Sequence, residues 1–222
     1  MVGCFEIEAV GERLWLMPER AVWWPRRETL IVADLHLGKS QALRAGGAAV
    51  PAGVLDESLA RLTSAIERAG ATRLLVVGDL LHAGIGLTPD LIDRVAAWRR
   101  EFPGVVAVVP GNHDRSLARV RDAWGLEITD GIHVDAPLAF VHDPATCENA
   151  DALPGVGFTW CGHVHPAVRI RGGGDAVKLP CFAIGPRLGL LPAFTRFAAG
   201  GGWSRASGWR TIAIAEERLI EV

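Results

Sequence analysis

Five short apolar segments of this chain run directly into Asp, Asn or His residues, whose side chains bind metal ions and move protons. In the clearest case, the segment 105–109 contains only Val and Ala and is followed by Pro110-Gly111-Asn112-His113-Asp114. The other four segments are followed by Asp34 and His36, by Asp79, by His142, and by His163 and His165. One shared metal site explains why the same polar residue types follow five separate segments.

The ligand types and their number indicate the chemistry of this site. Carboxylate, imidazole and amide groups without a thiolate suit borderline divalent metals such as Mn, Fe or Zn. The set holds more polar groups than a single ion needs, whereas two neighbouring ions that share one carboxylate use all of them. Such a metal pair activates water and stabilises in-line displacement at phosphorus. Two further histidines, His82 and His133, are interpreted as structural residues.

The apolar segments themselves predict an α/β fold. They are short, β-branched and uninterrupted, which is typical of parallel strands buried on both faces. Ligands of open α/β sheets bind at the carboxyl ends of such strands. Between the strands, Pro51 to Ala69 carries an apolar stripe at helical spacing, and Thr88-Pro89-Asp90 begins a second helix. A third helix is expected from Arg115 to Trp124.

The two ends of the chain are expected to be mostly β. Residues 1–28 predict short β segments, and after Ile128 strands follow one another without long helices between them, with a turn at 172–175. An αβ-repeat half followed by a mostly β half predicts two sheets packed face to face, with helices outside. No linker interrupts the pattern, so we expect a single domain over residues 1–222.

The composition limits the function classes. Half of the 222 residues are hydrophobic and 22% are charged, which is ordinary for a globular protein. A formal net charge of −2 does not indicate a strongly basic nucleic-acid-binding protein, so any DNA-contacting face has to be local. The four cysteines lack CxxC spacing and are expected to be reduced thiols. We see neither a signal-peptide pattern nor a membrane span, and expect a soluble, cytoplasmic protein without a membrane partner.

The polar blocks, in chain order, resemble the signature of a known superfamily. They are Asp34-x-His36, Gly78-Asp79, Gly111-Asn112-His113-Asp114, His142 and Gly162-His163-x-His165. This set resembles the calcineurin-like metallophosphoesterase superfamily over the whole span from Asp34 to His165. The resemblance implies a four-layer α/β/β/α sandwich of the metallophosphoesterase type and a dinuclear-metal phosphoesterase activity.

The same resemblance implies a role for each residue of the set. One metal ion is expected on Asp34, His36 and His165. The second is expected on Asn112, His142 and His163, with Asp79 bridging the two ions. His113 matches the catalytic histidine, which acts on the substrate without binding metal, and Asp114 matches its orienting partner.

Three further blocks narrow the resemblance, namely Asp34 to Lys39, Gly162 to Pro166 and Leu191 to Phe194. They are similar to the bacterial DNA-ligase-associated DNA damage response phosphoesterases. That group occurs beside an ATP-dependent DNA ligase and a helicase, and is taken to contain Mn-dependent nucleases or phosphodiesterases. For this chain the resemblance implies a DNA endonuclease or phosphodiesterase in DNA repair, functionally associated with the ligase and helicase, with Mn ahead of Fe or Zn as the metal.

Several basic residues are candidates for phosphate contact. Lys39 follows His36 closely, and Arg187 and Arg196 flank the block from Leu191 to Phe194. Arg99, Arg100 and the arginines from Arg115 to Arg121 would either meet a phosphate backbone or form a solvated helix face, and the sequence leaves both open.

Two other function classes were weighed against a DNA-cleaving enzyme. A phosphomonoesterase or nucleotide hydrolase acting on a small phosphate ester would need the same metal site and differ in the openness of its cleft. A non-catalytic scaffold that keeps the fold is disfavoured, because no ligand of the set is missing and His113 is present.

Overall fold

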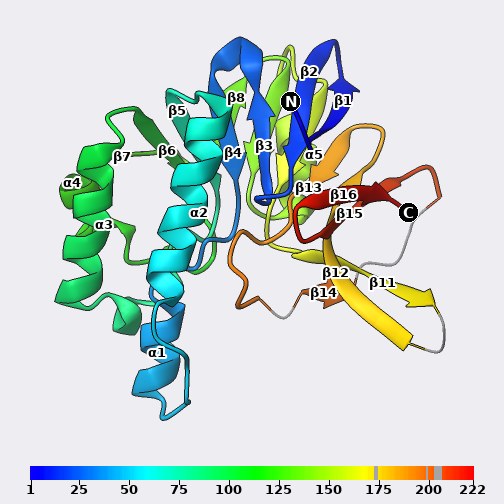
Figure 1. Cartoon of the computed structure of the whole chain (residues 1–222). Helices are drawn as coiled ribbons and strands as arrows, with labels where there is room; N and C mark the ends of the chain where they lie inside the picture. Colours follow the sequence, from blue (N-terminus) through cyan, green and yellow to red (C-terminus); the bar gives the residue numbers. More distant parts are fainter. Residues whose placement is uncertain (173–174, 199, 203–206) are drawn as a thin grey trace.

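Two β-sheets packed face to face form the centre of the molecule, and helices cover their outer faces (Figure 1). The computed structural model describes residues 1–172, 175–198, 200–202 and 207–222. The predicted two-sheet α/β architecture is confirmed, whereas the middle of the turn expected at 172–175 lies outside the described residues. No helix in the described part of the chain is long and apolar enough to span a membrane.

The first sheet has seven strands in sequential order from β1 to β7. Its strands are β1 Phe5–Ala9, β2 Glu12–Met17, β3 Ala21–Trp24, β4 Thr29–Val32, β5 Arg73–Val77, β6 Val105–Val109 and β7 Leu126–Ile128. The strands from β1 to β4 pair antiparallel, and those from β4 to β7 pair parallel. Val32, Val76 and Val108 lie side by side in the parallel part, so the carboxyl ends of β4, β5 and β6 are level.

Helices connect the parallel strands and cover the outer face of the first sheet (Figure 1). The α-helices are α1 Lys39–Ala45, α2 Val54–Ala69, α3 Pro89–Glu101, α4 Arg121–Trp124 and α5 Cys147–Asp151. The short 3-10 helices are η1 Pro25–Arg27, η2 Gly84–Gly86, η3 Leu117–Arg119 and η4 Pro144–Thr146. The helix predicted from Arg115 to Trp124 is divided into η3 and α4, because the fully buried Val120 leaves helical geometry at a φ of −121°.

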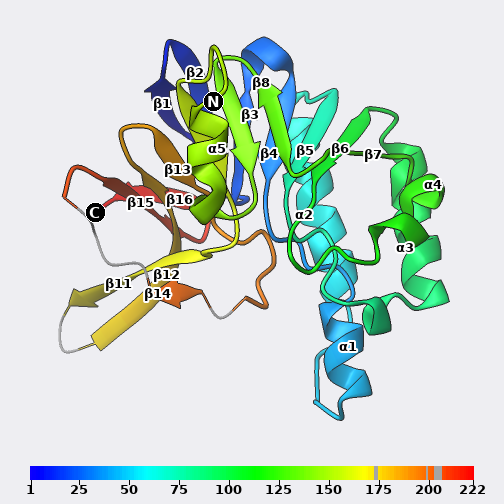
Figure 2. The same ribbon diagram turned by 180° about the vertical axis from the view of Figure 1, so that it is seen from behind.

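The second sheet has nine strands and runs in the order β14-β11-β12-β13-β10-β9-β8, with β15 and β16 added beside β12. Its strands are β8 Ile132–Asp135, β9 Leu138–Val141, β10 Phe158–Cys161, β11 Pro166–Gly172, β12 Asp175–Ile184, β13 Leu188–Leu190, β14 Gly201–Gly202, β15 Arg210–Ala215 and β16 Arg218–Glu221. Cys147 of α5 packs on the outer face of β9 and β10 (Figure 2). In the described part of the chain, the fourth layer of the sandwich is therefore one short helix.

Alternate residues of the central strands enter two different cores. Leu30, Val32 and their neighbours on β5 and β6 pack against α2 and α3, together with the predicted stripe Leu55, Leu59, Leu62 and Ile66. Ile31 and Ala33, with their neighbours, pack between the two sheets against Phe140 and Trp160. Because both faces of these strands are buried, their sequences are apolar without interruption.

Candidate metal centre and active site

The predicted metal ligands follow the carboxyl ends of β4, β5, β6, β9 and β10, so both sheets contribute to one site. Five of them adopt a positive φ between 49° and 67°: Asp34, His36, Asp79, His163 and His165. This left-handed conformation costs a non-glycine residue about 1–3 kcal/mol and persists only where surrounding contacts impose it. The loops after β4 and β5 supply such contacts, since the His36 N–H donates to the Asp79 carbonyl at 2.9 Å.

Asp34, His36 and His165 form a first group, whose ligand atoms all lie within 4.8 Å of one another. The Nε2 atom of His165 is 3.2 Å from Asp34 Oδ1 and 3.5 Å from His36 Nε2. Burial, followed by the charges of His165 and Lys39, lowers the pKa of His36 to about 3. The imidazole of His36 is therefore neutral near pH 7 and has a nitrogen lone pair available for a metal ion.

A second group contains Asp34, Asp79 and His142. Asn112 and His163 adjoin it, since Asn112 Oδ1 is 3.0 Å from His142 Nε2 and 3.1 Å from His163 Nδ1. His163 Nδ1 also lies 3.1 Å from His142 Nε2. The structure thus brings the three residues expected on the second ion, Asn112, His142 and His163, to one point.

Two carboxylates lie between the groups. Asp79 Oδ2 is 3.8 Å from His36 Nε2 and 3.5 Å from His142 Nε2, which is the placement expected of a bridging ligand. Asp34 Oδ1 is 3.2 Å from His165 Nε2 and 3.9 Å from His142 Nδ1. Asp34 therefore also faces both groups, a position that the sequence did not indicate.

The burial of these carboxylates fits divalent cations. Asp34 is 0% exposed and Asp79 is 2% exposed, and their ion-pair partners in the described part of the chain are histidines. Burying a carboxylate without a positive countercharge is strongly unfavourable. Cations held by the two groups would supply that charge, and the carboxylate, imidazole and amide donors match Mn, Fe or Zn.

His113 lies beside the two groups, and its side chain is exposed. Its backbone N–H donates to Asp79 Oδ1 at 2.9 Å, and its Nδ1 is 2.8 Å from the His82 carbonyl oxygen. A carbonyl only accepts, so Nδ1 carries the proton and Nε2 is the nitrogen available to a substrate. The rings of His82 and His113 stack at 5.2 Å with an interplanar angle of 15°. His82 is therefore part of the site, although it was interpreted as structural from the sequence, where its only signal is its position shortly after Asp79.

Asp114 holds the loop of His113 without contacting the ring that it was expected to orient. Its buried carboxylate accepts hydrogen bonds from the backbone N–H groups of Gly111 at 2.8 Å, Leu81 at 2.8 Å and Leu80 at 3.3 Å. Burial raises the pKa of Asp114 to about 6, against the lowering effect of these amides. Asp114, expected to be the orienting partner of His113, thus faces inward and ties the loop after β6 to the loop after β5, so it holds His113 through the backbone.

Two of the three predicted phosphate-binding residues lie near the site. Lys39, the first residue of α1, is close enough for its charge to lower the pKa of both His36 and His82. Arg196 lines a pocket together with His165. These positions keep Lys39 and Arg196 as candidates for substrate contact.

Two other residues lie at the opposite ends of the strands. Arg187 is exposed and precedes β13, which runs parallel to β10, whereas the metal ligands follow the carboxyl end of β10. The structure therefore does not bring Arg187 to the site. His133 lies with Arg73 at the start of β5, where its Nε2 is 2.9 Å from an Arg73 nitrogen, in keeping with the structural role inferred for it.

Three glycines let the backbone pass close to the ligands. A Cβ atom would collide with His142 at Gly78, with Asp79 at Gly111 and with Asp34 at Gly162. Gly78 also has a φ of +79°, which disfavours any side chain. Each of these three glycines is therefore required by a ligand from another strand, not only by its own turn.

Replacing Gly78 with alanine is expected to destabilise the protein by about 2–5 kcal/mol, through the left-handed backbone and the collision with His142. Gly70→Ala is the matched control, because Gly70 has a φ of +65° but no atom within 4 Å of the added Cβ. It should cost only about 1–2 kcal/mol. Thermal unfolding measures both variants, at roughly 2–4 °C per kcal/mol. Equal losses would show that the collision does not matter.

A two-sheet α/β protein with paired groups of carboxylate, imidazole and amide ligands at its strand ends has the architecture of a dinuclear metallohydrolase. The model of the calcineurin-like phosphoesterase family matches residues 28–165. The chain belongs to this family, and it is a metal-dependent phosphoesterase. The family uses a dinuclear metal centre, which agrees with the two ligand groups.

Solved structures resemble the chain to different degrees. The nuclease MPE of Pseudomonas putida is 31% identical, with a TM-score of 0.83, over 99% of this chain and 100% of that chain. A protein of unknown function from Aquifex aeolicus is 15% identical, with a TM-score of 0.44, over 62% of this chain and 78% of that one. An archaeal phosphodiesterase is 10% identical, with a TM-score of 0.43, over 87% and 98%. No curated protein sequence matches the chain.

Proposed function

We propose that this protein is a Mn-dependent DNA phosphodiesterase that acts as an endonuclease in DNA repair, in functional association with an ATP-dependent DNA ligase and a helicase. The observation that carries the proposal is the similarity to the nuclease MPE over 99% of the chain. The exposure of Asn112, His113 and His163 supports it, because a site that opens to the surface admits a polymer.

The chain's own residues account for the placement of the substrate. Bound cations supply an activated water and neutralise charge on the phosphate oxygens. The His82 carbonyl holds the Nδ1–H of His113, so proton donation to the leaving oxygen would need a second proton on Nε2, which the ring transfers to that oxygen and then recovers from water. General acid help of this kind contributes about 10²–10⁴-fold to the rate. Lys39, whose charge reaches His36, would meet a phosphate oxygen from the side of the first ligand group.

A phosphomonoesterase or nucleotide hydrolase acting on a small ester is the second candidate function, because the ligand groups would be the same. A plasmid nicking assay with Mn²⁺ separates the two, with Asp79→Ala as the inactive control. Nicking by the wild type alone supports the nuclease. Hydrolysis of a nitrophenyl phosphate ester without any nicking would favour the small-ester enzyme.

The same assay tests the metal and the link to the ligase. Mn²⁺ should support faster nicking than Mg²⁺, Fe²⁺ or Zn²⁺ at equal concentration. An ATP-dependent DNA ligase added afterwards should reseal part of the nicks. If the ligase reseals none of the nicks, this result would contradict the proposed functional association of the protein with the ligase.

A further inference from the structure

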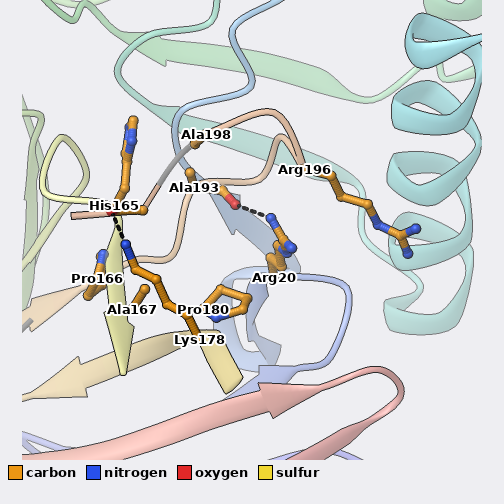
Figure 3. A pocket seen from close by; sticks show the side chains of 10 residues that line it. Arg20, His165, Pro166, Ala167, Lys178, Pro180, Ala193, Arg196 and Ala198 are labelled. Carbon is orange, nitrogen blue, oxygen red and sulfur yellow. Dashed lines mark hydrogen bonds between the residues drawn. The ribbon is translucent and has the colours of Figure 1, made fainter. Parts of the chain in front are cut away.

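A pocket of about 190 Å³ adjoins the candidate metal site. It shares only His165 with the two ligand groups among its described lining residues. His165 forms part of its wall, and Arg20, Lys178 and Arg196 are its charged lining residues. We call this cavity the basic pocket. Figure 3 shows Lys178 on the side of His165 and Arg20 across from them, with Arg196 directed away. The remaining lining residues are Pro, Ala and Gly, so none of the described residues that line the pocket is acidic.

Arg20 is fixed in place from the turn between β2 and β3. One terminal nitrogen of its guanidinium donates to the carbonyl oxygens of Ala193 at 3.1 Å and Thr195 at 2.7 Å. Burial, followed by the charge of Arg196, lowers the pKa of Arg20 to about 10. Among the described residues, no carboxylate lies within 4.0 Å of Arg20. Its remaining N–H donors therefore suit an anion from outside the chain.

Further positive charge stands behind Arg20. Arg61 of α2 donates to the Phe194 carbonyl and lies 4.4 Å from the centre of the Phe194 ring. Its pKa is lowered to about 10 by burial and then by Arg20 and Arg196, so the three guanidinium groups are close together. Glu57 pairs with Arg196 at 2.7 Å, but both side chains are more than half exposed, and such pairs contribute little.

Lys178 completes the pocket from the second sheet. It lies on β12, and its Nζ donates to the Gly200 carbonyl at 2.7 Å, near the backbone of His165. An ammonium group has three N–H donors, so it can hold this carbonyl and a phosphate oxygen at once. Arg20 and Lys178 thus approach one small space from different sheets.

We propose that the basic pocket binds the phosphate adjacent to the scissile one in a single nucleic-acid strand, an inference that rests on the proposed function. His165 belongs to both the first ligand group and the pocket wall, so the basic pocket directly adjoins the candidate metal site. Arginine, lysine and a water-accessible cavity are the typical means of contacting a strand's phosphates. An ester with a single phosphate leaves this pocket empty, so the pocket favours a polymer over a small substrate.

Binding of a fluorescein-labelled single-stranded 12-mer, followed by fluorescence anisotropy without added metal, tests the proposal. Lys178→Gln and Arg20→Gln should each weaken binding about 5–20-fold at low salt. Each should also reduce the slope of log affinity against log salt, and the double variant should reduce it by about 0.7, the value for one phosphate contact on a single strand. If Arg20→Gln unfolds because it loses the hydrogen bonds to Ala193 and Thr195, the affinity and salt slope of Lys178→Gln alone test the proposal.

Arg13→Gln is the matched control. Arg13 carries the same charge as Arg20, lies on β2 with its side chain 71% exposed, and pairs with Glu6 at the other end of that strand. It should change neither the affinity nor the salt slope. Wild-type affinity and slope in both pocket variants would overturn the proposal. Pyrophosphate and unlabelled 12-mer are also compared as competitors of the labelled 12-mer. If pyrophosphate competes as strongly per phosphate, the proposal is overturned in favour of a small bisphosphate ligand.

The outcomes separate this inference from the proposed function, because binding is measured without cleavage. If the pocket variants bind weakly but the wild type never cuts DNA, the pocket stands and the nuclease assignment fails. If the wild type cuts DNA and the variants bind as it does, the nuclease assignment stands and the pocket fails.

Discussion

Asp79→Ala is expected to lose bound metal and to reduce the rate of phosphodiester hydrolysis by more than about 10³-fold. Asp79 is 2% exposed and its Oδ2 faces both ligand groups, at 3.8 Å from His36 and 3.5 Å from His142. Its Oδ1 also accepts the His113 N–H at 2.9 Å. One substitution therefore removes the carboxylate that faces both ligand groups and loosens the loop of His113.

Asp79→Asn separates these two effects. The amide oxygen can still accept the His113 N–H, but the negative charge between the ligand groups is lost. The Asp79→Asn variant should therefore bind little metal, while its unfolding temperature stays near that of the wild type. Metal analysis of the purified variants and the rate on bis-nitrophenyl phosphate measure the effect. The control is Asp93→Ala, an exposed aspartate of α3. Full metal content in Asp79→Asn would exclude the bridging role.

His113→Ala is expected to retain its metal and to lose about 10²–10⁴-fold in turnover on DNA. The side chain is exposed beside the ligand groups, and its Nδ1–H is held by the His82 carbonyl at 2.8 Å. The loss should be smaller on a nitrophenyl ester, because a nitrophenolate leaves without a proton, whereas a sugar oxygen needs one. This difference between substrates is the signature of proton donation to the leaving group.

His133→Ala is the matched control for this variant. His133 is also a histidine, but it lies with Arg73 at the far end of the first sheet, where burial and then the Arg73 charge lower its own pKa. Its loss should lower the unfolding temperature and leave turnover and metal content near the wild type. An empty metal site in His113→Ala, or equal rate losses on both substrates, would contradict the proposed role.

The sequence by itself predicted the α/β class and which residues lie together at one site. Each ligand block follows an apolar segment, and both faces of those segments are buried, so their hydrophobic pattern was legible without any knowledge of the fold. Parallel strands bring their carboxyl ends level, as Val32, Val76 and Val108 do here. Residues just past those ends converge whatever the loops between them contain, and for this reason Asp34, Asp79 and Asn112 could be assigned to one site.

Only the tertiary structure decided where side chains lie that do not directly follow the carboxyl end of a parallel strand. His82 and His133 were both interpreted as structural histidines from the sequence. In the structure His82 stacks on His113, whereas His133 lies at the opposite end of the strands. Arg187 was excluded from the site by the direction of β13, and Arg20 was brought to it by the packing of the β2–β3 turn on the loop of Ala193. Contacts of this kind depend on strand direction, on sheet order and on which loops pack together, and these are set by residues far apart in the sequence.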